Sequence, residues 1–299
     1  MTRFRNRKAP RFALMALAES QTKVDTSTRI FSMSSFIGLK ADGYEPIGMV
    51  SGSEAVHLST LDYKSASWRP NGQWATTAGD PSQTSVDGGE FPLAGYARAL
   101  EHGWQLALSR LLQSVVELGG CGAIDVKVSE DRRIAGVRGL SLVGLAVRGP
   151  NRASAPPFAT ALSGMDLAKL HRLGWMPIAL VVATAISMRR NDALSGMMIH
   201  QSVMPGEIPS HTHLLIGARN AARDLADDRT LQLGAVGLLI SGPIETRVEE
   251  LHSRGTDYED FMAEARVIGT AIRQTTATDL PIGEPSFGVD LGRQKKNQT

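Results

Sequence analysis

Residues 43–50 read Gly-Tyr-Glu-Pro-Ile-Gly-Met-Val, and residues 174–181 read Gly-Trp-Met-Pro-Ile-Ala-Leu-Val. In both stretches a glycine, an aromatic residue and a proline open an apolar run, and a serine-containing segment precedes the glycine. This pattern predicts a short helix that is capped by serine, ended by the glycine and followed by a strand. The second stretch lies 131 positions after the first (43 to 174), so we interpret the chain as a tandem duplication of one unit.

Two further blocks repeat in the same order. Residues 118–122 (Leu-Gly-Gly-Cys-Gly) match residues 233–237 (Leu-Gly-Ala-Val-Gly), and residues 143–148 match residues 268–273. The offset changes from block to block. This change indicates that the loops differ in length between the two units, while the helices and strands keep their lengths. These boundaries predict five segments: a basic tail 1–27, a first unit 28–149, a proline-rich linker 150–157, a second unit 158–275 and a polar tail 276–299.

Each unit is predicted to contain one long helix. In the first unit this helix covers about residues 93–118, because its apolar side chains recur at spacings of three and four. That stripe comprises Leu100, Trp104, Ala107, Leu108, Leu111, Val115 and Leu118. The corresponding helix, about residues 213–233, carries Arg219 and Arg223 where the first helix has Trp104 and Leu108. The two helices are therefore expected to face different surroundings.

The remaining elements are predicted to be strands. In the first unit they cover about residues 47–57, 124–129 and 140–147, with a polar, exposed loop at 62–91. Ile124, Val126 and Val128 alternate with polar residues, so they are expected to share one face of the sheet. The sequence therefore predicts an α+β protein of two tandem β-α-β-β units, each a small antiparallel sheet with one long helix. Such a unit is too small to bury both sheet faces, so association between units or between chains is expected.

Composition restricts the class of protein. The chain has 299 residues, 42% hydrophobic and 21% charged, which is typical of a globular protein. Its net charge is +2, but residues 1–11 contribute five positive charges and no negative one. The single cysteine, Cys121, excludes a disulfide framework within one chain. The apolar run near the N-terminus is too short for a signal peptide, and no uncharged run reaches the length of a membrane span. We therefore expect a soluble, cytoplasmic protein.

The quoted blocks together resemble the YbjQ-like family, which is often described as a putative heavy-metal-binding domain. The resemblance covers roughly residues 30–149 and 158–274 and involves residues 43–52, 118–123 and 142–148. It implies a dodecin-like β-α-β-β fold that assembles into closed, typically pentameric rings. The second unit departs from the family pattern, since residues 179–183 (Ala-Leu-Val-Val-Ala) replace the glycine-containing residues 48–52. A ligand site need not be equivalent in the two units.

The strongest metal-ligand candidates are His211 and His213. A His-x-His pair on a strand would place both rings on one face and could bind zinc or copper. Here the pair directly precedes the second long helix, a position that favours capping or solvent exposure. Cys121 is interpreted as a small packed residue, because Val236 stands at the matching position. The glycines around it follow a helix rather than precede one, which argues against a phosphate loop.

No nucleophile and base converge in the sequence. The acidic residues near the strands do not match between units and are interpreted as solvated charges; they include Asp125, Glu130, Asp131 and Glu264. The basic N-terminal tail could contact an anionic partner, but an unstructured, solubilising tail is the favoured interpretation. Trp68 and Trp74 in the long loop indicate either a contact surface or local packing.

These observations favour a non-catalytic, ring-forming homo-oligomer that acts as an assembly or scaffold module. The alternative hypothesis is a protein that binds a metal or a small ligand at subunit interfaces. Under both hypotheses we expect no enzymatic activity and no organic cofactor. Under the alternative hypothesis, a divalent metal is a possible cofactor.

Overall fold

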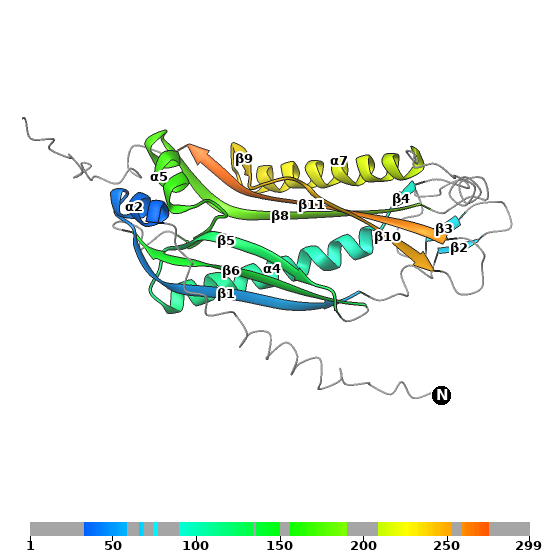
Figure 1. The fold of residues 1–299 in the computed structure, drawn as a ribbon, viewed down its shortest axis with the longest axis horizontal. Helices are drawn as coiled ribbons and strands as arrows, with labels where there is room; N and C mark the ends of the chain where they lie inside the picture. The colour runs from blue at the N-terminus through cyan, green and yellow to red at the C-terminus, as the bar shows by residue number, and fades with distance from the viewer. Residues whose placement is uncertain are drawn as a thin grey trace, which may run out of the picture.

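The computed structural model describes residues 33–58, 66–68, 74–76, 90–133, 136–149, 156–189, 209–252 and 259–274. It is an α+β protein, as expected (Figure 1). We call the described residues up to 149 the first half and those from 156 the second half. The first half contains α2 (Met33–Ala41), β1 (Glu45–His57), β2 (Ala66–Trp68), β3 (Trp74–Thr76), β4 (Glu90–Pro92), α4 (Ala94–Glu117), β5 (Gly122–Asp131) and β6 (Val137–Arg148).

The second half has a similar order of elements. It contains β7 (Phe158–Ala159), α5 (Gly164–Arg172), β8 (Trp175–Arg189), α7 (Pro209–Gln232), β9 (Gly237–Ile240), β10 (Glu245–His252) and β11 (Glu259–Gln274). In each half a short helix is followed by a long strand, a long helix and an antiparallel set of strands. In Figure 1 the short helices α2 and α5 lie together at one end of the molecule.

Two sheets form the framework. The first sheet has the order β1-β6-β5-β7, and the second has the order β10-β11-β8-β4 with β9 also paired to β11. All of these pairs are antiparallel except β5 with β7. The last strand of each half is therefore central, and it pairs on one side with the long first strand of the same half.

The core has three parts. The long helix α4 packs on the first sheet, and the even-numbered face of β8 packs against the same cluster, so this core belongs to both halves. The other face of the second sheet packs under α7 through small side chains, including Ala218, Ala222 and Ala226. A third cluster joins α2 and α5 to the remaining face of the first sheet. The expected association is thus present between the two halves of one chain.

The glycines predicted to end α4 and the two short helices are confirmed, as is the serine cap of α5. The helix α4 covers Ala94–Glu117, and Gly119 follows it with a φ of +70°. Gly43 and Gly174, which end the two short helices, also have positive φ angles of 73° and 76°. The side chain of Ser163 accepts the backbone N–H of Asp166 and so caps α5. Glycine fits the positive-φ positions because it has no Cβ to clash with the backbone.

The predicted face of β5 is wrong. Ile124 pairs with Leu145 and packs in the cluster of the short helices, whereas Val128 pairs with Leu142 on the side of α4. The cause is a bulge between Ile124 and Lys127, where Asp125 has a φ of 49°. One extra residue in a strand reverses the alternation of every side chain beyond it. Ile124 therefore does not share a face with Val126 and Val128.

The long loop of the first half also contains regular structure. Most of residues 59–89, like both predicted tails and residues 150–155 of the linker, lie outside the described residues. Strands β2 and β3 pair so that Trp68 lies opposite Trp74. Strand β4 joins the second sheet by pairing with residues 187–189 of β8. The first half thus contributes a strand to the sheet of the second half, which the sequence pattern did not indicate.

Candidate functional site

A pocket of about 220 Å³ lies where the two halves meet. Its walls are the middle of α4, the strand β8 and the C-terminal end of α7. The lining side chains are mostly apolar and comprise Glu101, Trp104, Gln105, Leu108, Leu142, Ala179, Leu180, Val181, Val182, Arg229, Gln232 and Leu233. A concave, mostly apolar cavity with a few polar groups is the usual form of a small-molecule site. Its volume is below that of a typical drug-sized site, so it fits a smaller molecule.

The two charged residues of the pocket, Glu101 and Arg229, are paired with each other. A guanidinium nitrogen of Arg229 lies 2.6 Å from a carboxylate oxygen of Glu101, and these side chains are 13% and 28% exposed, respectively. Arg229 also donates a hydrogen bond to the backbone carbonyl of Val182. The pair therefore neutralises the pocket and ties α7 both to α4 and to the edge of β8.

Trp104 separates the pocket from a charged cluster. Its side chain is almost fully buried, and the guanidinium carbon of Arg266 lies 5.6 Å from the centre of its ring. A cation over an aromatic face is attracted by the ring quadrupole. Trp104 is therefore held in one place between the pocket and the cluster.

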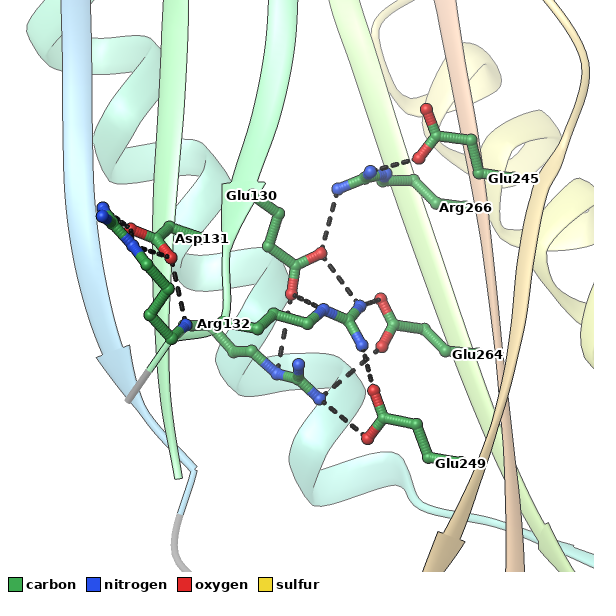
Figure 2. Close-up of polar contacts among 9 residues, drawn as sticks. Glu130, Asp131, Arg132, Glu245, Glu249, Glu264 and Arg266 are labelled. Atoms are coloured by element: carbon green, nitrogen blue, oxygen red, sulfur yellow. Dashed lines mark hydrogen bonds and ion pairs between the residues drawn. The ribbon is translucent and has the colours of Figure 1, made fainter. Parts of the chain in front are cut away.

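The charged cluster, which we call the ion-pair network, joins the two sheets (Figure 2). Its members are Glu130, Arg132 and Arg138 from the first half and Glu245, Glu249, Glu264 and Arg266 from the second. Arg132 lies at the centre, 2.8 Å from Glu130 and 2.6 Å from Glu264, and it also pairs with Glu249. Arg266 lies 3.1 Å from Glu130. The network thus connects the halves through charge-assisted hydrogen bonds.

The interpretation of Glu130 and Glu264 as solvated charges is wrong. Each of these side chains is only 6% exposed, and each contacts arginines of the network. The partners come from opposite halves, 132 positions apart in the case of Arg132 and Glu264. A local sequence pattern cannot show such a pairing, although Glu264 between two alanines of an apolar strand was a signal of burial.

Burial and the nearby Glu130 carboxylate raise the pKa of Glu264 above its ordinary value of 4.5, and Arg132 and Arg138 oppose this shift. Because the folded pKa is raised, this group contributes stability that is fully present below the unfolded pKa and is lost as the pH rises through the folded pKa. We therefore expect Glu264→Gln to lose less stability than the wild type between pH 5 and pH 8. Urea denaturation at the two pH values measures this difference.

The matched control is Glu117→Gln, since Glu117 is exposed at the end of α4. This variant should follow the pH dependence of the wild type. If Glu264→Gln also followed it, the burial of an ionised Glu264 would not limit stability at neutral pH.

The predicted metal ligands His211 and His213 lie in the first two turns of α7, which begins earlier than expected. The ring of His211 packs 4.1 Å from that of Phe261, centre to centre, and burial lowers the pKa of His211, with Arg189 adding to the shift. His213 is exposed. Side chains two positions apart on a helix point in different directions. Among the described residues no group of three His, Cys, Asp or Glu side chains is placed to hold a metal ion. Metal binding by this pair stays a prediction.

One histidine that the sequence did not single out has a buried acidic partner. His171 near the end of α5 pairs with Asp42 just after α2, and both side chains are less than 10% exposed. Tyr44 packs beside His171. The pair lies in the contact between α2 and α5, where Gly38 and Gly164 let the helices approach closely. Its place in a helix–helix contact indicates that it joins the two halves.

Cys121 is half-buried, and its sulfur lies 3.4 Å from the carbonyl oxygen of Val147, in keeping with a packed residue at the start of β5.

None of the helices in the described ranges is long and apolar enough to cross a membrane. No protein-family model matches the sequence, and a search of curated proteins found no match.

Proposed function

We propose that the chain is a binding protein for a small, largely apolar molecule, held in the pocket between its halves. The observation that carries the proposal is the pocket itself, with apolar walls from α4 and β8 and one neutralised charge pair. The site lies at the boundary of the two halves, which corresponds to the hypothesis of ligand sites at subunit interfaces. In this proposal the second half takes the place of a neighbouring subunit.

The order of elements supports an origin by tandem duplication. Each half has a central last strand flanked by its long first strand, and each long helix packs on the sheet of its own half. The middle strand of the second half is divided into β9 and β10, both of which pair with β11. Duplication and the likeness to YbjQ-like, dodecin-type units remain our proposals, as do a non-catalytic role and a cytoplasmic location.

A substitution that fills the pocket tests the proposed function. Leu108 on α4 lines the pocket and is half-buried, so Leu108→Trp should occupy the cavity. The chain has four tryptophans, and fluorotryptophan labelling gives each of them a separate ¹⁹F signal. We expect small apolar fragments to shift the Trp104 signal selectively in the wild type, and we expect Leu108→Trp to abolish that shift.

Leu106→Trp is the control, because Leu106 lies on the same helix, is 38% exposed and does not line the pocket. It should leave fragment binding unchanged. The proposed function is rejected if no fragment shifts the Trp104 signal, or if both leucine variants bind fragments equally well.

Self-assembly is a second candidate, favoured by an exposed apolar surface at the C-terminal end of α7 and on β9. Leu231 and Val236 are each 71% exposed and Ile240 is 50% exposed. Such a surface is typical of a protein–protein contact. A second copy of the chain could cover it, and the ring implied by the family resemblance is one such assembly.

Light scattering on the purified chain tests the second candidate. We expect an oligomer for the wild type and a smaller mass for Val236→Glu. The control Val116→Glu changes another exposed valine, 56% exposed on α4, and should leave the mass unchanged. A wild-type chain that is monomeric at about 100 μM would exclude this role.

A further inference from the structure

We propose that the molecule bound in the pocket is neutral and carries an amide-like pair of one hydrogen-bond donor and one acceptor. This inference rests on the proposed function and specifies its ligand. It follows from two independent features of the pocket, the charge pair and the edge of β8.

The charge pair argues for a neutral ligand. Glu101 and Arg229 are the charged residues that line the pocket, and they compensate each other at 2.6 Å. The amide of Gln105 also donates to the Glu101 carboxylate, at 3.2 Å. A charged ligand would lose its hydration on entering the pocket, and it would find no uncompensated opposite charge there. Transfer of an unpaired charge into an apolar site is costly. A neutral ligand avoids that cost.

The edge of β8 argues for the donor–acceptor pair. In an antiparallel sheet the backbone groups of alternate residues point toward the partner strand or away from it. The carbonyls of Val182 and Ile186 point away from β11, because they accept hydrogen bonds from Arg229 and from the backbone N–H of Leu93. Leu180 has the same parity as these residues and pairs with Thr270, which in turn pairs with β9 on its other side. The N–H and C=O of Leu180 therefore point away from β11.

These two groups of Leu180 are open within the described part of the chain. Strand β4 covers β8 only at residues 187–189, and no described residue bonds to the backbone of Leu180 on this side. Leu180 lines the pocket together with its neighbours in β8. One N–H and one C=O on the same strand edge match an amide, which offers the complementary acceptor and donor. The apolar walls around them would enclose the rest of the molecule.

Four molecules with the same phenyl body test this inference: phenylacetamide, methyl phenylacetate, phenylacetate and phenethylamine. Titration of each against the full chain, followed by the Trp104 ¹⁹F signal, gives the dissociation constants. We expect the amide to bind about tenfold more tightly than the carboxylate and the amine. It should also bind several-fold more tightly than the ester, because the ester has no donor and so forms one hydrogen bond fewer with the strand edge.

Two variants test the role of charge. Glu101→Gln leaves Arg229 without its counter-charge and should shift the preference toward phenylacetate. Arg229→Gln leaves Glu101 unpaired and should shift it toward phenethylamine. The reciprocal change is a readout that loss of structure would not produce.

The outcomes separate the ligand class from the proposed function. If phenylacetate or phenethylamine binds the wild type most tightly, the neutral ligand is wrong while the pocket remains a binding site. If the ester binds as tightly as the amide, the strand edge does not take part. If none of the four molecules moves the Trp104 signal but other apolar fragments do, the amide class is rejected. If no fragment moves that signal, the proposed function fails as well.

Discussion

Arg132→Ala is expected to destabilise the protein by about 3–5 kcal/mol, the range found when one partner of a buried ion pair is removed. Arg132 is 16% exposed and contacts Glu130, Glu249 and Glu264. Its removal leaves the buried carboxylates of Glu130 and Glu264 with less compensation, and these groups remain costly to bury. Chemical denaturation measures the loss in the free energy of unfolding.

The adjacent residue provides the control. Arg133 is 77% exposed and pairs with Asp131, which is 44% exposed. An exposed pair of this kind contributes about 0–1 kcal/mol, so Arg133→Ala should be nearly neutral. Equal stability of the two variants would show that the ion-pair network does not hold the halves together.

Gly52→Ala is expected to cost about 3 kcal/mol or more, because β1 and α4 meet backbone to backbone at this glycine. A Cβ at residue 52 would lie 2.0 Å from the carbonyl oxygen of Ala107 and 2.6 Å from the backbone nitrogen of Leu111. The helix would have to move away from the sheet, and overpacking of this kind typically costs about 1–3 kcal/mol, occasionally more. Thermal and urea denaturation measure the effect.

Gly48→Ala is the matched control in the same strand. Its Cβ would meet only the side chain of Leu118, at 3.4 Å, so this variant should be within about 1 kcal/mol of the wild type. An equal loss in both variants would mean that the close approach of α4 to Gly52 does not determine the effect. Residue 183, the counterpart of Gly52 at the offset of 131, is an alanine that packs with the small side chains under α7.

Local features of the fold could be predicted from the sequence. Apolar spacing placed α4 to within one residue at each end, because one face of that helix is continuously buried. Glycines at positive φ and the serine cap of α5 also lay where the sequence indicated. These features depend on the conformational preferences of a few neighbouring residues.

Other features depend on contacts between distant residues, and these the sequence did not reveal. The bulge at Asp125 reversed the face of β5 without a glycine or proline to mark it. The pocket draws its residues from α4, β6, β8 and the end of α7, and the network pairs Arg132 with Glu264 across the two halves. The alanines on either side of Glu264 indicate burial, but no local pattern shows that Glu264 contacts Arg132 or that Glu130 contacts Arg266 of the other half.

The core shared by both halves also affects how the chain folds during its synthesis. Trp104 and Leu100 of α4 belong to the same cluster as Leu180, Met188 and Met262. Some of the residues that bury Trp104 and Leu100 are therefore translated long after α4. About 160 residues separate Trp104 from Met262, which takes the ribosome roughly 8–30 s at 5–20 residues per second. Until β8 and then β11 are translated, the side of α4 that faces these strands has no partner within the nascent chain. The core around α4 is therefore complete only after the last strand, β11, has been translated.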